Sequence, residues 1–183
     1  EYHMKKVLVV MGSDSDLKVM EKCVDRLKSF DIPVEVRICS AHRTPAVAEQ
    51  LAKNAAAEGF GVIIAAAGKA AHLGGVLAAS LSTTRKIGVY LHGDYPVLND
   101  FATGFYQGAS TVNPDIKIFT AYGAGVSGDS PRAAELTKIM FNNGADVVYG
   151  AAGSANPGLF QNVIDLGGFE KGYYAIGVDY DQW

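Results

Sequence analysis

Several features that mark particular classes of protein are absent from this sequence. The 183 residues contain no run of basic side chains and carry a formal net charge of −3, which excludes the charge pattern of a nucleic-acid-binding protein. No apolar stretch reaches the length of a bilayer span, and the N-terminal residues have no signal-peptide core. We therefore expect no nucleic-acid partner, no membrane partner and a cytoplasmic location on recombinant expression, without a signal peptide.

Cysteine is scarce as well. Cys23 and Cys39 are the two cysteines of the chain, and their spacing matches no metal-binding motif. Cys23 lies in a helical pattern and Cys39 at the end of a predicted strand, so we expect two buried thiols in a reducing compartment. A disulfide or a reactive thiol is the alternative interpretation. No metal and no cofactor are expected.

The residues that are present favour a folded α/β protein. Hydrophobic residues make up 49% of the chain and charged residues 19%, which is typical of globular proteins. Short apolar runs alternate with segments of helical periodicity. The expected strands span residues 7–10, 34–38, 62–66, 87–91, 116–121, 147–150 and 174–178. The expected helices span residues 16–30, 45–59, 70–81, 97–112, 131–143 and 157–166. Strict alternation predicts a three-layer αβα fold with a mostly parallel sheet of seven strands.

The loop after the first predicted strand has the composition of a phosphate-binding loop. Ligands of parallel sheets bind at the carboxyl ends of the strands, so the loops that follow the strands are the candidate sites. Residues 12–16 read Gly-Ser-Asp-Ser-Asp and combine a close backbone turn with hydroxyls at a helix start. A simple helix cap has the same composition and is the alternative interpretation.

The next two loops also carry residues suited to chemistry. Ser40, His42 and Arg43 follow the second strand, where arginine suits a phosphate and histidine suits proton transfer. An ordinary surface loop with a helix cap is the alternative. Residues 67–75, after the third strand, offer small side chains and free amides for a carboxylate, although His72 is equally an ordinary helix-start residue.

Taken together, these three loops resemble the active-site loops of the class I carboxyaminoimidazole ribonucleotide mutase (PurE) family. The resemblance covers roughly residues 5–80 and rests on residues 12–16, 40–45 and 67–73, with Lys69 and Gly74 departing mildly from the usual pattern. It implies a flavodoxin-like fold and a role in purine biosynthesis. Carried over by motif, the substrate-binding residues are Ser13, Ser40 and Arg43 for the phosphate, Asp16 for the ribose, and the amides near Ala71, His72 and Leu73 for the carboxylate. His42 is the implied general acid and base.

The second half resembles a different family, the PnrA-like nucleoside-binding lipoproteins of ABC importers, also called basic membrane proteins. The resemblance covers roughly residues 83–183 and implies a lobe of the type I periplasmic-binding-protein fold. The motifs that carry it span residues 86–89, 96–105, 112–116, 143–147, 150–153 and 176–182. Asp179 is the implied ribose ligand and Phe160 the implied base-stacking aromatic. The alternatives are a strand-end turn residue for Asp179 and a helix core residue for Phe160.

Two halves from different families predict an engineered chimera, divided into residues 1–82 and 83–183 and joined between Ala78 and Ile87 as one fused domain. We favour a single seven-stranded sheet over two small sheets packed as lobes. We expect no evolved catalytic activity, with a weak phosphate or ribonucleotide site retained at the strand edge. The alternatives are a working mutase and a nucleoside-binding lobe. A monomer or small homo-oligomer is expected, rather than the octamer of the mutases.

Overall fold

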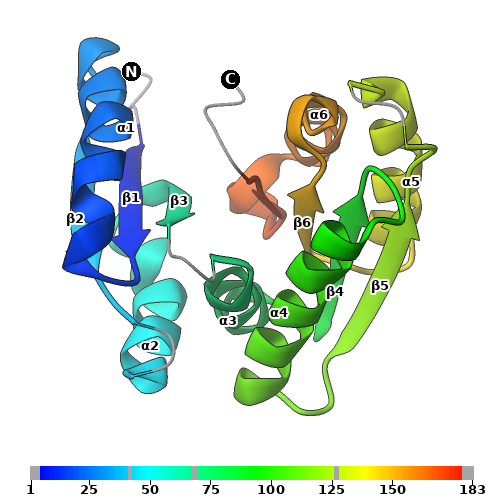
Figure 1. The fold of residues 1–183 in the computed structure, drawn as a ribbon, viewed down its shortest axis with the longest axis horizontal. Helices are drawn as coiled ribbons and strands as arrows, with labels where there is room; N and C mark the ends of the chain where they lie inside the picture. Colours follow the sequence, from blue (N-terminus) through cyan, green and yellow to red (C-terminus); the bar gives the residue numbers. More distant parts are fainter. Residues whose placement is uncertain (1–4, 41–42, 67–69, 126–127, 179–183) are drawn as a thin grey trace.

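The chain folds into helices and parallel strands, as the alternating pattern predicts (Figure 1). The computed structural model describes residues 5–40, 43–66, 70–125 and 128–178. Within these residues there are seven strands, and every pairing between them is parallel. The strands are β1 (Lys6–Met11), β2 (Val34–Ile38), β3 (Phe60–Ala66), β4 (Lys86–Leu91), β5 (Lys117–Tyr122), β6 (Val147–Ala151) and β7 (Tyr174–Ile176).

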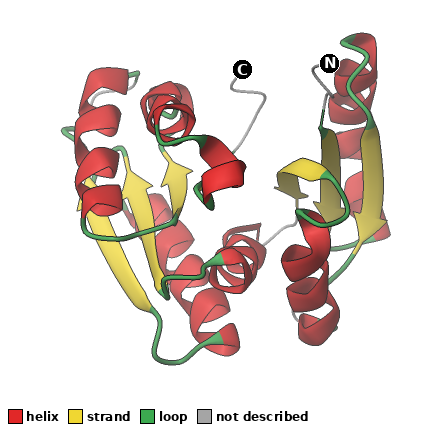
Figure 2. Ribbon diagram, turned by 180° about the vertical axis from the view of Figure 1, so that it is seen from behind, coloured by secondary structure: helices red, strands yellow, loops and turns green. Residues whose placement is uncertain are grey.

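Helices connect and cover these strands (Figure 2). The α-helices are α1 (Leu17–Ser29), α2 (Pro45–Ala55), α3 (Ala70–Leu81), α4 (Pro96–Val112), α5 (Ser130–Asn142) and α6 (Pro157–Asp165). Short 3₁₀ turns are η1 (Asp14–Asp16), η2 (Gly153–Ala155) and η3 (Gly168–Lys171). Helix α5 is capped by Asp129, whose side chain accepts a hydrogen bond of 2.9 Å from the amide of Arg132.

The strands form two sheets, so the expectation of a single seven-stranded sheet is wrong. The first sheet has the order β2-β1-β3 and the second has the order β5-β4-β6-β7. The reason lies with β4, which pairs with β5 on one side and β6 on the other. Both of its edges are therefore used, and it has none left for β3. The predicted parallel α/β class itself is confirmed.

The first sheet is covered by helices on both faces, which explains the uninterrupted apolar sequence of β1. Alternate residues of β1 point to opposite faces, and the residues from Leu8 to Met11 are fully buried. Val7, Val9 and Met11 pack with Val24 of α1. Leu8 and Val10 pack on the other face with α2 and α3.

Helix α3 belongs to both halves of the molecule. Leu73, Val76 and Leu77 pack in the core beneath the first sheet, while Ala71, Ala78 and Ala79 pack with α4 and the second sheet. Residues 73–80 are buried throughout, which explains why this helix is apolar around its whole circumference. In Figure 1, α3 accordingly lies in the centre of the molecule, between the two sheets. On its far face, the second sheet is covered by α5 and α6.

Glycines allow α3 and α4 to approach at backbone distance. A Cβ atom at Gly75 would lie 2.0 Å from the carbonyl oxygen of Phe105. A Cβ atom at Gly108 would lie 2.0 Å from the carbonyl oxygen of His72. Any side chain at either position therefore has to push the two helix backbones apart, since backbone atoms cannot swing away as side chains do.

A buried carboxylate ties the segment between α3 and β4 to the start of β6. Asp146, which is 4% exposed, accepts hydrogen bonds from the hydroxyl of Ser82 (2.6 Å) and from the amides of Thr83 (2.7 Å) and Thr84 (2.9 Å). A buried carboxylate needs such donors to offset its lost hydration. The contact fixes where the chain leaves α3 and enters the second sheet.

The cysteines are partly as expected. Cys39 is buried at 3% exposure, but Cys23 is only half-buried on α1, so the expectation of two buried thiols holds for Cys39 alone. Both are free thiols in the structure. Among the described helices, none is long and apolar enough to cross a membrane.

The α3–α4 contact predicts that alanine destabilises the fold at Gly75 and Gly108 but not at Gly74. Gly75→Ala and Gly108→Ala are each expected to lower the free energy of unfolding by about 2–4 kcal/mol, because the new methyl group meets backbone atoms. Gly74→Ala is the matched control on α3, since a Cβ atom there would meet only side-chain atoms, at 4.0 Å. That variant should stay within about 1 kcal/mol of the parent chain. Urea unfolding measures all three, and equal losses at positions 74 and 75 would contradict the close contact.

Tyr174 on β7 predicts a loss of stability at alkaline pH. Burial raises the pKa of the Tyr174 phenol, and the nearby charge of Asp146 raises this pKa further. A raised pKa in the folded state stabilises the fold below about pH 10, the pKa in the unfolded chain, and that contribution is lost as the pH rises through the folded-state pKa. Tyr174→Phe should therefore lose less stability than the parent chain between about pH 9 and pH 11. Urea unfolding across this range tests it, with the same two proteins at neutral pH as the reference. Parallel losses would contradict it.

Candidate functional site

The loop after β1 forms a compact turn whose polar groups are gathered at the end of the strand. Ser13 caps η1, and its hydroxyl accepts a hydrogen bond of 3.3 Å from the amide of Ser15. The Ser13 amide in turn donates to the Asp16 carboxylate at 3.0 Å, which completes a capping box. Both interpretations of residues 12–16 therefore apply to the geometry: the loop caps a helical segment, and it also holds hydroxyls and amides at the sheet edge.

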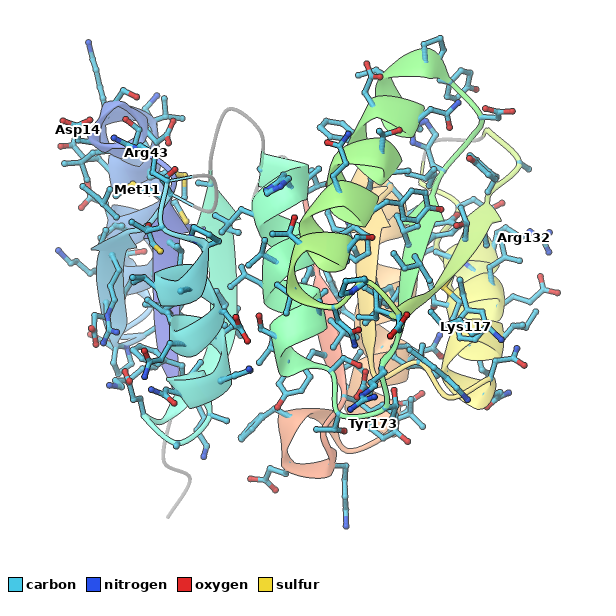
Figure 3. All side chains as sticks on the ribbon, turned by 90° about the horizontal axis from the view of Figure 1, so that it is seen from below. Met11, Asp14, Arg43, Lys117, Arg132 and Tyr173 are labelled. Atoms are coloured by element: carbon cyan, nitrogen blue, oxygen red, sulfur yellow. The ribbon has the colours of Figure 1, made fainter. Side chains whose placement is uncertain are left out.

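The loop after β2 lies beside it and reaches across to it. The Ser40 hydroxyl accepts a hydrogen bond of 3.2 Å from the Arg43 amide, which folds the loop back on itself. The Arg43 guanidinium donates to the carbonyl oxygen of Gly12 at 3.4 Å. Figure 3 shows Arg43 and Asp14 at the same end of the first sheet. Ser13, Ser40 and Arg43, which were predicted to hold a phosphate together, thus belong to two loops that touch.

Backbone hydrogen bonds align the ends of all three strands of this sheet. The Cys39 amide donates to the carbonyl of Met11 at 2.7 Å, and the Gly12 amide donates to the carbonyl of Ala66 at 2.9 Å. The loops after β1, β2 and β3 therefore start at one edge, as expected for parallel strands. His42, the predicted general acid and base, lies outside the described residues.

The start of α3, which follows the third loop, packs into the core, and the predicted role of its amides in binding a carboxylate stays a prediction. Ala71 and Leu73, near the start of α3, have side chains that are 5% and 2% exposed and pack into the two cores. The His72 carbonyl lies against Gly108, and a Cβ atom at Gly104 would lie 3.3 Å from the Ala71 side chain. The first turn of α3 is therefore packed against α4, and residues 67–69 of the third loop lie outside the described residues.

Arg43 brings an exposed positive charge to this edge. Within the described part of the chain, none of the ion pairs includes Arg43, so its guanidinium has no carboxylate partner there. Such an exposed cation beside hydroxyls and amides suits a phosphate, which arginine binds with two parallel hydrogen bonds. No group of three or more histidine, cysteine or acidic side chains suited to a metal ion is present among the residues described.

Phe160 and Asp179 are the two residues of the second half that were predicted to bind a nucleoside. The structure describes only Phe160. Phe160 on α6 is half-buried and packs against a core cluster that includes Ala133, Met140 and Leu159. This placement matches the alternative that Phe160 is a helix core residue, and its role as a stacking aromatic stays a prediction. Asp179 lies outside the described residues.

Sequence reasoning overlooked two residues of the first edge. The Asp14 carboxylate accepts hydrogen bonds of 3.0 Å from the Ser13 hydroxyl and from the Ser15 amide. The Thr44 hydroxyl donates to the Ser40 carbonyl at 2.9 Å and so fixes the second loop. The signal for Thr44 was visible, since a threonine before Pro45 is typical of a helix start. Asp14 gave no signal of its own, because an aspartate is common at a helix start for capping alone.

Comparisons with known proteins match the two ends of the chain to different families, with an overlap between them. Residues 6–101 match the AIR carboxylase family, and residues 69–183 match the family of PnrA-like ABC transporter substrate-binding proteins. Each match extends past the limits of 80 and 83 expected from the sequence. Their overlap, residues 69–101, contains α3, β4 and the start of α4.

The curated relatives found for this chain are N5-carboxyaminoimidazole ribonucleotide mutases. The protein of Methanocaldococcus jannaschii is 52% identical over 83 residues, which is 45% of this chain and 50% of the relative. The protein of Pyrococcus abyssi is 39% identical over 140 residues, which is 75% of this chain and 76% of the relative. Apart from this longer match to the Pyrococcus abyssi protein, the chain spans about half the length of the curated relatives it matches.

Solved structures show the fold of the whole chain. A solute-binding protein of an ABC transporter from Aeropyrum pernix superposes with a TM-score of 0.57 at 19% identity, covering 97% of this chain and 63% of the other. A transcriptional activator of the comK gene from Bacillus halodurans gives a TM-score of 0.52 at 22% identity, covering 97% and 72%. The fold is thus that of the solute-binding proteins and extends over both sheets. By its sequence the chain belongs to two families, AIR carboxylase over its first half and the PnrA-like substrate-binding proteins over the remainder.

Proposed function

We propose that this chain binds the phosphate group of a ribonucleotide at the edge formed by Ser13, Ser40 and Arg43, and that it does not catalyse the mutase reaction. The observation that carries the proposal is the reach of the Arg43 guanidinium from the loop after β2 to the Gly12 carbonyl of the loop after β1. That contact gathers a cation, hydroxyls and amides at one exposed position. The mutases among the relatives act on a ribonucleotide, which supplies the class of ligand.

The same proposal includes the origin of the chain as an engineered chimera of two families joined into one folding unit. Its support is the change of family model along the chain, since the match to the AIR carboxylase model ends at residue 101 and the match to the PnrA-like model runs from residue 69 to residue 183. Catalysis requires reacting groups held within fractions of an ångström of their working positions. In this chain the match to the AIR carboxylase family model ends at residue 101, within α4, which supports the proposal that part of the surroundings of a mutase site is missing.

The binding proposal is tested by calorimetric titration with a purine ribonucleotide. We expect a dissociation constant on the order of 1 mM, about 4 kcal/mol of binding free energy, for a site with one arginine and a few neutral donors. Arg43→Met should weaken binding at least about tenfold, because it removes the charge-assisted hydrogen bonds to the phosphate. Arg85→Met is the control, since this exposed arginine precedes β4 in the second half. A nucleoside without the phosphate should bind no better to the parent chain than to Arg43→Met. Equal affinity of the parent chain and Arg43→Met for the ribonucleotide would overturn the proposal.

The absence of turnover is tested with purified protein and the carboxylated mutase substrate. We expect a rate indistinguishable from the spontaneous reaction, and the same rate for His42→Asn. A rate above background that His42→Asn abolishes would establish the mutase alternative instead. The mass of the particle in solution, measured by light scattering in the same buffer, shows whether any such activity accompanies an octamer.

A further inference from the structure

We propose that the carboxylate of Asp14 is an internal competitor for the phosphate and thereby sets the affinity of the site. The inference rests on the proposed phosphate site and adds a specificity-determining residue to it. Asp14 is exposed at the first position of η1, directly between the two serines of the loop. Its carboxylate oxygens present the same kind of acceptor that a phosphate would present.

The hydrogen bonds show what the competitor occupies. The Oδ1 atom of Asp14 accepts from the Ser13 hydroxyl at 3.0 Å and from the Ser15 amide at 3.0 Å. These are donors at the turn where a phosphate oxygen would have to bind. Another donor of the turn, the Ser13 amide, is held by Asp16 at 3.0 Å. A phosphate that uses the Ser13 hydroxyl and the Ser15 amide must therefore displace the side chain of Asp14.

Charge acts in the same direction as these hydrogen bonds. Arg43 lies at the same end of the sheet (Figure 3), and no ion pair joins it to Asp14 among the described residues. The guanidinium thus keeps its binding capacity for an incoming anion, while the negative charge of Asp14 repels that anion. Removing the charge of Asp14 therefore lowers two costs of binding, the displacement of a hydrogen-bonded carboxylate and the repulsion between like charges.

The test is a titration of the full chain with inorganic phosphate and with a purine ribonucleotide. Asp14→Asn should bind both ligands about three- to tenfold more tightly than the parent chain, as expected for one removed competing charge. Asp14→Ser should also bind more tightly, which separates the effect from any hydrogen bond made by an asparagine. Glu21→Gln is the matched control: it removes one exposed negative charge from α1 without touching the loop, so its affinity should stay within about twofold of the parent.

The outcomes separate this inference from the function on which it rests. Tighter binding by both Asp14 variants with an unchanged Glu21→Gln supports the competitor role, including the case in which the parent chain alone binds too weakly to measure. Equal affinities for the parent and both Asp14 variants overturn the competitor role and leave the phosphate site standing. No binding by any variant overturns both. A gain of the same size in Glu21→Gln assigns the effect to net charge and also overturns the competitor role. Unfolding in urea without ligand checks that the variants fold alike.

Discussion

The close packing of α3 against α4 is the constraint on which the rest of the structure depends. Glycine at positions 75 and 108 brings the two helix backbones into direct contact, and α3 is buried on its other side by the first sheet. The chain leaves α3 on the side of α4, where Asp146 holds the connecting segment, and β4 starts a second sheet. The two sheets are thus joined through the α3–α4 interface.

Local sequence patterns predicted the elements but not their assembly. The strand at 34–38 and the helix at 70–81 have the predicted limits, because apolar periodicity and flanking breakers are local signals. The helix predicted for residues 45–59 ends earlier, at Ala55, and a turn leads to Gly59 at a φ of +85°. The single-sheet prediction failed for a different reason. Whether β4 pairs with β3 or with β5 and β6 is decided by contacts between segments far apart in the sequence, which no window around β4 contains.

The candidate site shows the same division between local and distant information. The loops of residues 12–16 and 40–43 could be predicted because glycine, serine and arginine after a strand have a direct chemical meaning. The burial of Ala71 could not, since it depends on the approach of α4, which lies beyond the next strand. The hydrogen bonds of Asp14 also could not be predicted, because they depend on which side the carboxylate takes at the turn. Composition predicts a kind of site, whereas packing between distant segments decides which of its residues are exposed.

The helix interface also bears on what the site can do. The His72 carbonyl lies against Gly108 and the Ala71 side chain lies against Gly104, so the first turn of α3 packs on α4. The loops after β1 and β2 carry the described donors that suit a phosphate. A site that held only the phosphate end of a ribonucleotide would leave the reacting end mobile, and a mobile substrate rarely reaches the reactive geometry. This is the physical reason why the proposed function is binding without reaction.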